Sequence, residues 1–141
     1  MLKIIYYIII LVLAVVLLQP YGGTWAYELG LRWVYVFLIG FAISNLLAPA
    51  CIRLGHKYNF LDMPNERKVH SHPVPRIGGI AIYLAFLAAI VRNLQFSREI
   101  LGLVAGGTII FILGLLDDIK PVSATVRMLF QAAAALVAVY F

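Results

Sequence analysis

The sequence of 141 residues has few charged residues and almost no cysteine. Charged residues make up 12% of the chain, against about 25% in an ordinary soluble domain, whereas hydrophobic residues make up 64%. The single cysteine, Cys51, excludes a disulfide within the chain, and its apolar surroundings predict a buried, unreactive thiol. Because a chain of this length cannot bury so many apolar residues in a core, most of them must face lipid. The composition therefore excludes an ordinary soluble globular domain.

Five apolar runs approach the ~20 residues that a helix needs to cross ~30 Å of hydrocarbon. They cover residues 4–18, 33–52, 77–91, 100–116 and 125–141. They predict an all-α polytopic membrane protein with about five transmembrane helices, in a single integral-membrane segment of residues 1–141. The last run stays apolar to Phe141 without a polar stop, which is typical of a chain truncated relative to a longer protein.

The first apolar run has two interpretations. Lys3 precedes it and resembles the positively charged region that opens a secretory signal peptide. No cleavage site of small residues follows Leu17 and Leu18, however. This favours a helix that is retained over a signal peptide.

Basic residues are unevenly distributed outside the apolar runs. If the amino terminus is cytoplasmic, eight of the eleven Lys and Arg lie inside and three outside, as the positive-inside rule expects. Residues 53–76 and 117–127 then face the cytoplasm, and the cytoplasmic loops are 53–76 and 117–124. We therefore attribute the net charge of +5 to membrane topology and not to nucleic acid binding. The outer loop contains aromatic residues of the kind found at headgroup level, namely Tyr21, Trp25, Tyr27, Trp33 and Tyr35.

The first cytoplasmic loop and the start of the next helix combine cations, prolines and a glycine pair. Pro64, Pro73 and Pro75 favour a stiff extended path, and the two glycines allow close approach of the backbone. Amides exposed at a helix start, beside several cations, are suited to binding phosphate groups. The candidate phosphate-binding residues are Arg67, Lys68, His70, Arg76, Gly78 and Gly79. The alternative is that these cations contact only anionic lipid headgroups.

Two adjacent carboxylates, Asp117 and Asp118, follow the fourth apolar run at a membrane boundary. Negative charge at a helix carboxyl end is unfavourable by about 0.3 to 1 kcal/mol for each residue, and Lys120 offsets only part of this. Acidic residues at a bilayer edge are functional candidates, because an ion or a proton usually accounts for them. Two carboxylates beside a diphosphate suit Mg²⁺ and phosphoryl transfer. The alternative is a helix cap, in which Asp118 and Ser123 accept hydrogen bonds from amides leading into the next helix.

Two motifs in these loops carry a resemblance to a known family. The first spans residues 62–82 and contains Asp-Met-Pro-Asn, Arg-Lys-Val-His and Pro-Arg-Ile-Gly-Gly. The second joins Gly-Leu-Leu-Asp-Asp at 114–118 to Ser123, Ala124, Arg127 and Gln131. Over residues 33–141 the chain resembles the polyprenyl-phosphate N-acetylhexosamine-1-phosphate transferases. This family includes bacterial initiators of teichoic acid and O-antigen synthesis and, more distantly, phospho-N-acetylmuramoyl-pentapeptide transferase.

The resemblance implies an activity and its participants. It implies transfer of N-acetylhexosamine 1-phosphate from a UDP-sugar to undecaprenyl phosphate, with release of UMP, at the start of cell-envelope polysaccharide synthesis. It implies Mg²⁺, or Mn²⁺ in its place, and catalytic and metal-binding roles for Asp117 and Asp118, shared with a carboxylate outside this chain. It implies a multi-pass protein of the bacterial cytoplasmic membrane with a cytoplasmic active face. The partners would be the lipid bilayer, polyprenyl phosphate and UDP-N-acetylhexosamine, with a homodimer as an open alternative.

The family is longer than this chain. Its members carry a further asparagine and aspartate motif and a histidine-rich loop, neither of which occurs in these 141 residues. We therefore expect an amino-terminal part of the enzyme that is inactive alone. The competing hypothesis is a non-catalytic small membrane protein that binds polyprenyl phosphate or pairs with an intact homologue. The small residues Gly102, Gly106 and 132–135 permit close helix packing in either case.

Overall fold

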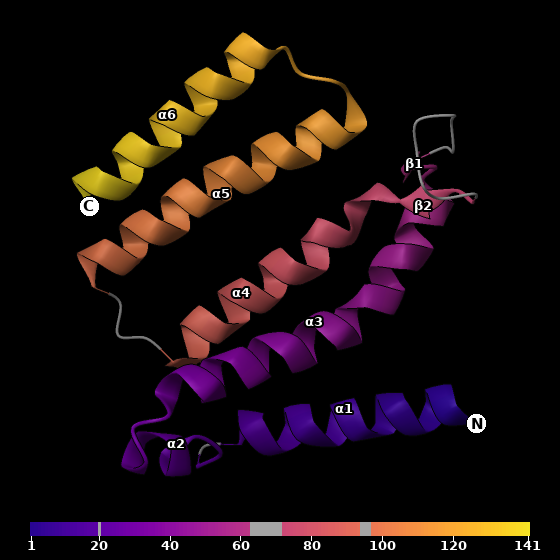
Figure 1. Cartoon of the computed structure of the whole chain (residues 1–141), viewed down its shortest axis with the longest axis vertical. Coiled ribbons are helices and arrows are strands. Elements are labelled where there is room, and N and C mark those ends of the chain that lie inside the picture. Colours follow the sequence, from indigo (N-terminus) through magenta and orange to yellow (C-terminus); the bar gives the residue numbers. More distant parts are fainter. Residues whose placement is uncertain (20, 63–71, 94–96) are drawn as a thin grey trace. The chain divides into compact units, whose positions relative to one another are not determined.

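The computed structural model describes residues 1–19, 21–62, 72–93 and 97–141. Within them the chain is all-α, as predicted, apart from one short pair of strands (Figure 1). The helices are α1 (Leu2–Leu18), α2 (Thr24–Glu28), α3 (Arg32–Lys57), α4 (Gly79–Asn93), α5 (Arg98–Ile119) and α6 (Ala124–Tyr140). The strands are β1 (Leu61–Asp62) and β2 (Val74–Pro75), and the 3-10 turn η1 covers Arg76–Gly78. The chain groups into two compact units, residues 1–54 with 80–93 and residues 55–79 with 94–141.

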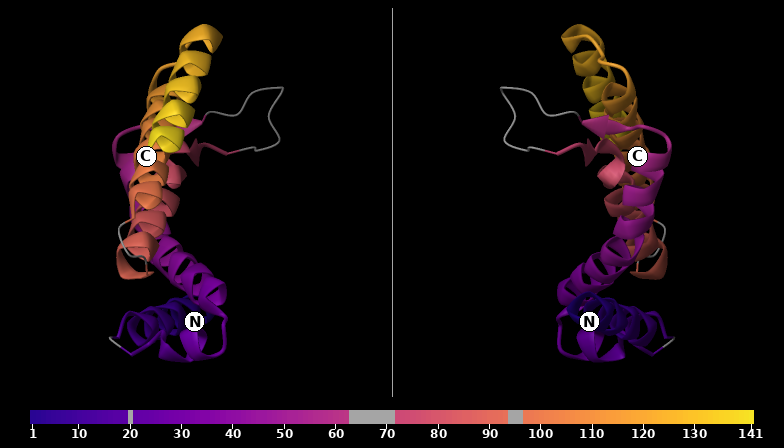
Figure 2. Two further views of the ribbon diagram at one scale, coloured as in Figure 1. Left: turned by 90° about the vertical axis from the view of Figure 1, so that its left-hand side faces the viewer. Right: turned by 90° about the vertical axis from the view of Figure 1, so that its right-hand side faces the viewer.

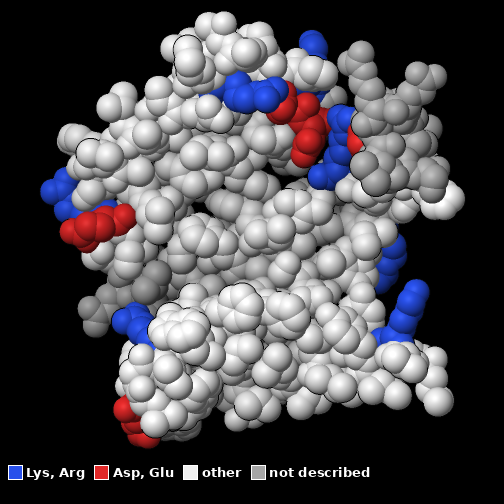
Figure 3. Space-filling view, in the orientation of Figure 1, with Lys and Arg blue, Asp and Glu red and all other residues white. Residues whose placement is uncertain are grey.

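Several helices have the apolar character of membrane spans. In the described part of the chain, α3 and α5 are long and apolar enough to cross a membrane, and α1 and α6 are apolar but shorter. Large apolar side chains stay exposed on the short helices, with Ile4 at 66% and Val139 at 85%. On the face shown in Figure 3, charged atoms form a few small groups and most of the surface is uncharged. Five spanning helices remain a prediction, whereas a surface that suits lipid is observed.

The first unit contains α1, α2, α4 and most of α3 around two small apolar clusters. The larger cluster is centred on Tyr35 and Ile39 of α3, both of which are 1% exposed. The smaller cluster joins α1 to α3 through Ile10, Ala14 and Ala42. Cys51 is also buried, at 5% exposed, which confirms the prediction of a buried thiol.

The carboxyl end of α1 is bonded to side chains of α3 and α4. The hydroxyl of Tyr35 donates to the carbonyl of Leu17 at 2.7 Å, and Arg92 Nη2 donates to the carbonyl of Gln19 at 2.8 Å. These carbonyls belong to the group that a helix end leaves without an intrahelical donor. Tyr35 is therefore buried at this contact, whereas the other aromatic residues predicted at headgroup level, namely Tyr21, Trp25, Tyr27 and Trp33, are exposed.

The second unit starts where α3 ends in a Schellman motif. Asn59 has a φ of 56°, in the left-handed region, which asparagine tolerates better than most residues. The amides of Asn59 and Phe60 donate to the carbonyls of His56 at 3.4 Å and Gly55 at 2.9 Å. A Cβ atom on Gly55 would lie 2.7 Å from Cβ of Pro75, so this glycine lets β2 pack on the last turn of α3.

The two short strands pair antiparallel. Leu61 lies opposite Pro75, and Asp62 lies opposite Val74. Arg76 directly follows β2 and begins η1. The pairing therefore brings the end of β1 beside the start of η1, although more than ten residues separate them along the chain.

The rest of the second unit is an antiparallel pair of helices, α5 and α6, which lie side by side in Figure 1 and Figure 2. A Cβ atom on Gly106 would lie 2.8 Å from the carbonyl oxygen of Ala134. A Cβ atom on Gly102 would lie 2.6 Å from Cβ of Phe141. The small residues that the sequence analysis identified therefore serve close packing within one chain.

Several helix boundaries differ from the predicted ones by one to five residues. The helices α3 and α5 continue beyond residues 52 and 116, to Lys57 and Ile119, and α4 begins at Gly79 after η1 and not at residue 77. An apolar run ends at its first charge, whereas a helix ends where its backbone is capped or interrupted. Here the interruptions are the left-handed Asn59 and Pro121. The predicted cytoplasmic loops 53–76 and 117–124 therefore each begin inside a helix.

Candidate functional site

The strand pair holds Asp62 and Arg76 together. Arg76 Nε donates to Asp62 Oδ1 at 3.0 Å, Nη2 forms an ion pair with the same oxygen, and the Arg76 amide donates to the carbonyl of Phe60 at 3.0 Å. The hydrogen bond that Arg76 donates to Asp62 raises the pKa of Arg76 further above its ordinary high value, and the charges of the nearby aspartates act in the same direction. Arg76 is therefore a permanent cation fixed at the start of η1.

Arg76 also contacts the carboxyl end of α5. Its Nη1 atom donates to the main-chain carbonyl of Asp118 at 3.3 Å. The last carbonyls of a helix lack donors from the helix itself, so the guanidinium satisfies one of them. This contact joins the two sequence motifs, which lie 42 residues apart at these positions. The Arg76 side chain remains 37% exposed, so its guanidinium still faces the surface of the site.

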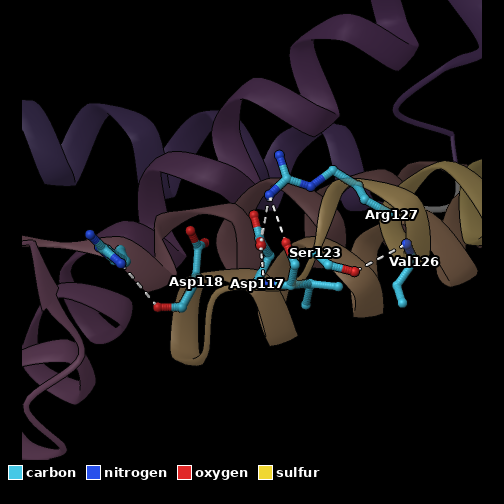
Figure 4. A network of polar contacts seen from close by, with 7 residues as sticks. Asp117, Asp118, Ser123, Val126 and Arg127 are labelled. Carbon is cyan, nitrogen blue, oxygen red and sulfur yellow. Dashed lines mark hydrogen bonds and ion pairs between the residues drawn. The ribbon is translucent and has the colours of Figure 1, made fainter.

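Asp117 is bonded on the other side, to the turn between α5 and α6. Its Oδ1 atom accepts a hydrogen bond from the amide of Val122 at 2.8 Å and another from Arg127 Nη2 at 2.9 Å (Figure 4). The same nitrogen of Arg127 lies 3.5 Å from the carbonyl of Val122. One carboxylate oxygen therefore connects the end of α5, the turn and the first part of α6.

The capping alternative is half correct. Ser123 accepts from the amide of Val126 at 3.4 Å, so it is the N-cap that the sequence predicts for α6. The other amide, that of Val122, is satisfied by Asp117 and not by Asp118. Among the residues that the structure describes, none forms a hydrogen bond or ion pair with the carboxylate of Asp118, and the dashed line that reaches this residue in Figure 4 ends on its main-chain oxygen.

These side chains border one open cavity of about 550 Å³ in the second unit. Its lining consists of Asp62, Val74, Pro75, Arg76, Asp117, Asp118, Pro121 and Arg127. Three carboxylates and two guanidiniums therefore share the cavity, and Figure 3 shows acidic atoms between basic ones at this edge. Each guanidinium is paired with one carboxylate, which leaves a negative charge on Asp118.

The structure brings together only part of the predicted site. Arg76, Asp117 and Asp118 line the same cavity. Gly78 and Gly79 lie at the adjoining end of η1 and start of α4, and an added Cβ on either would meet open space. Arg67, Lys68 and His70 lie outside the described residues, so their predicted contacts with phosphate stay predictions.

Two charged residues of the cavity were not among the candidate site residues predicted from the sequence. Asp62 opens the first motif and Arg127 belongs to the second, but neither was named as a site residue. Arg127 had a detectable signal, because it is the only charged residue of the predicted helix 125–141. A charge within an apolar helix is itself a functional indication. Asp62 had no such signal, because its role depends on the pairing of β1 with β2.

The donor set can be compared with the needs of Mg²⁺. Among the described residues, no group of three or more His, Cys, Asp or Glu is placed to hold a metal ion. Mg²⁺ commonly takes only one or two protein carboxylates and completes its octahedron with water and phosphate oxygens. The unpaired carboxylate of Asp118, with Asp117 beside it, fits this partial role but not a complete protein-built metal centre.

The fold and the cavity define a class: a helical protein with apolar helices of membrane length and a polar cavity in which carboxylates are paired with arginines. No protein-family profile and no solved structure matches the chain. Curated relatives do match. The chain is 31% identical over 110 residues to a probable undecaprenyl-phosphate N-acetylglucosaminyl 1-phosphate transferase of Bacillus subtilis, an alignment covering 77% of this chain and 31% of that protein.

Two further relatives have related names. An undecaprenyl-phosphate alpha-N-acetylglucosaminyl 1-phosphate transferase of Thermotoga maritima is 35% identical over 104 residues, covering 74% of this chain and 31% of that protein. A decaprenyl-phosphate N-acetylglucosaminephosphotransferase of Mycolicibacterium smegmatis is 32% identical over 108 residues, covering 70% and 27%. The chain belongs to this family of polyprenyl-phosphate sugar-1-phosphate transferases, as its two motifs predict. It spans about a third of the length of the curated relatives it matches.

Proposed function

We propose that this chain forms part of a membrane transferase that moves N-acetylhexosamine 1-phosphate from a UDP-sugar to undecaprenyl phosphate and releases UMP. This would be the first step in building a cell-envelope polysaccharide. The observation that carries the proposal is the cavity that Arg76 of the first motif shares with Asp117 and Asp118 of the second, in which Arg76 contacts the main-chain carbonyl of Asp118. The names of the relatives support the choice of lipid and sugar.

In such a transfer, an oxygen of the lipid phosphate attacks the phosphorus that carries the sugar, and the bond from that phosphorus to the UMP oxygen breaks. Both reactants are anionic, so catalysis depends on positioning and on neutralising negative charge. Arg76, whose guanidinium lines the cavity and reaches both motifs, would attract the phosphate groups. Asp118 is the carboxylate available to orient the attacking phosphate or accept its proton.

Mg²⁺ belongs to the proposal as a shared ion, with Mn²⁺ as a substitute. Asp118 and Asp117 would supply oxygen ligands, and the substrates and other protein groups would supply the rest. When bound, the ion would neutralise charge on the diphosphate. The two hydrogen bonds from Val122 and Arg127 both end on Oδ1 of Asp117, so its Oδ2 atom could serve the ion without breaking them.

The proposed location follows from the same chemistry. Nucleotide sugars are cytoplasmic substrates, and the positive-inside distribution of Lys and Arg supports a position of both motifs at the cytoplasmic face of the bacterial inner membrane. The apolar helices would hold the site at the bilayer edge, where a polyprenyl phosphate presents its headgroup.

A second candidate function comes from the length of the alignment. Because the chain spans about a third of its relatives, it could instead bind polyprenyl phosphate without transferring sugar, or pair with an intact homologue. In this case the cavity would bind the phosphate of the lipid, but the protein would not catalyse transfer of the sugar phosphate.

An exchange assay tests the proposal. Labelled UMP is incubated with UDP-N-acetylglucosamine, undecaprenyl phosphate and Mg²⁺, and incorporation of label into the UDP-sugar is measured. The protein is expressed as this 141-residue chain and as a reading frame extended beyond Phe141, in a host lacking its own enzyme of this family. We expect exchange only in the extended form, and its loss on chelation of Mg²⁺.

The outcomes separate the two functions. Exchange by the 141-residue chain would show that our expectation of an inactive part is wrong. Absence of exchange in every form, together with retained binding of undecaprenyl phosphate in nanodiscs, would favour the non-catalytic protein. The matched control is Arg98→Gln, an exposed cation at the opposite end of α5 from the cavity.

A further inference from the structure

Asp117 and Arg127 are each unfavourably placed in their own helix. Asp117 lies in the last turn of α5, where the helix carries partial negative charge, and Arg127 lies in the first turn of α6, where the charge is partly positive. Helix stability alone therefore accounts for neither residue. A contact between them would remove both conflicts at once.

The structure contains this contact, and three groups take part in it: the side chains of Asp117 and Arg127 and the main chain of Val122. Oδ1 of Asp117 accepts from Arg127 Nη2 at 2.9 Å and from the Val122 amide at 2.8 Å, and the same Arg127 nitrogen approaches the Val122 carbonyl at 3.5 Å. Both the amide and the carbonyl of one turn residue are thus tied to the ion pair. The path of the chain from α5 to α6 depends on these three groups.

The pairings leave one carboxylate of the cavity open. Asp62 is paired with Arg76, and Asp117 with Arg127. Arg76 approaches Asp118 only at its main-chain carbonyl, so within the described residues the Asp118 side chain is without a protein partner. Asp118 is covalently next to Asp117, so its orientation depends on how firmly the end of α5 is held.

We propose that Arg127 is a positioning residue of the site. Together with the Val122 amide it holds Asp117 and the α5–α6 turn, and it thereby presents the unpaired carboxylate of Asp118 to the cavity. The effect on turnover rests on the proposed function, whereas the effect on the turn does not. Arg127 acts through Asp117 and need not touch a substrate.

If Arg127 served only to stabilise the fold, its replacement would lower the stability of the helices. The Arg127 and Asp117 side chains are 48% and 28% exposed, and ion pairs as exposed as this contribute little to the free energy of folding. Removal of the guanidinium should therefore leave the helices folded. The change should be confined to the turn and to the rate of the reaction.

The first test measures hydrogen exchange of single amides by NMR on the 141-residue chain in nanodiscs. In Arg127→Gln we expect the Val122 amide to exchange about tenfold faster, because the oxygen that it binds loses its second partner. The Val126 amide, which is bonded to Ser123, serves as an internal control and should not change. Asp117→Asn should also accelerate exchange at Val122, whereas Asp118→Asn should not.

The second test measures turnover in whichever form supports UMP exchange. We expect Arg127→Gln to lower kcat about 10- to 100-fold with little change in KM for either substrate, as for other residues that orient a reacting group. Arg127→Lys keeps the charge and should recover part of the rate. It also keeps the test valid if Arg127→Gln fails to fold. Arg98→Gln should match the parent protein.

Distinct results would overturn the proposal. Unchanged exchange at Val122 in Arg127→Gln would show that the guanidinium does not hold the turn. A raised KM with unchanged kcat would make Arg127 a substrate contact and not a positioning residue. If no form supports UMP exchange, the proposed function fails, but the hydrogen-exchange test still decides whether Arg127 holds the turn.

Discussion

At the scale of single residues, the two adjacent aspartates differ in their surroundings. Asp117 accepts two hydrogen bonds through one oxygen, from Val122 and Arg127. Asp118 is held through its main chain by Arg76, and its carboxylate faces the cavity. In the sequence the two form a single pair of adjacent carboxylates. Their division follows from the helix geometry, because neighbouring side chains on a helix point about 100° apart.

Replacement of either aspartate should remove activity in the enzyme that supports UMP exchange. We expect Asp117→Asn and Asp118→Asn each to lower exchange by more than about 100-fold, because each loses a charge in the phosphate site. Membrane insertion should be normal, since neither change makes the helices less apolar. Exchange rates and the amount of protein in washed membranes provide the measurement. Normal turnover in either variant would contradict the assignment of the site.

Arg76 contacts both motifs, so its replacement should affect the binding of substrate. Arg76→Ala removes the ion pair with Asp62 and the bond to the Asp118 carbonyl, so we expect weaker binding of the phosphate-bearing substrates. A rise of about tenfold in KM for at least one substrate is expected from the loss of a charge-assisted contact. Lys120→Ala, an exposed cation outside the cavity lining, is the control. Unchanged KM values for both substrates would count against Arg76.

At the scale of elements, the site depends on two features that terminate helices. The Schellman motif at Asn59 stops α3 and turns the chain into β1, and Pro121 stops α5 two residues before the N-cap of α6. The N-cap at Ser123 could be read from the sequence because capping uses only neighbouring residues. The pairing of β1 with β2 could not, because it joins residues far apart in the sequence.

The contact between α5 and α6 can be tested by comparing the stability of two glycine substitutions in α5. Gly106→Ala places a Cβ atom 2.8 Å from the Ala134 carbonyl oxygen, so α6 must shift, at a cost of about 1–3 kcal/mol. Gly114→Ala on the same helix meets no atom within 4 Å and should stabilise the helix by about 0.5–1 kcal/mol. Unfolding in detergent, followed by circular dichroism, compares the two. Equal effects of the two substitutions would show that α6 does not pack at Gly106.

At the scale of the whole molecule, the predicted topology can be tested with single cysteines. The only native cysteine, Cys51, is 5% exposed, and a Cys51→Ala background removes it. His72→Cys and Lys120→Cys lie at exposed positions in the two predicted cytoplasmic loops, and Glu28→Cys at an exposed position in the outer loop. A membrane-impermeant maleimide applied to spheroplasts should label only position 28. Labelling of position 72 or 120 before permeabilisation would reverse the orientation.

The sequence by itself determined the class of this protein. Its apolar composition requires a lipid-facing helical chain, and the runs of apolar residues locate the helices to within a few residues. The two motifs, with Arg76, Asp117 and Asp118, identified the family, which the relatives confirm. These properties were readable because they are local: they depend on residue type and on spacing along one element.

Only the tertiary structure decided how the site residues are paired. The contact of Arg76 with the Asp118 carbonyl depends on the strand register. The pairing of Asp117 with Arg127, which leaves the Asp118 carboxylate unpaired, depends on the close contact of α5 with α6. An ion pair forms where distance and orientation allow, and the chain fixes these through packing between elements. The spacing of residues along the sequence does not determine the distance between two charged groups. The proposed positioning role of Arg127 therefore depends on the arrangement of the helices.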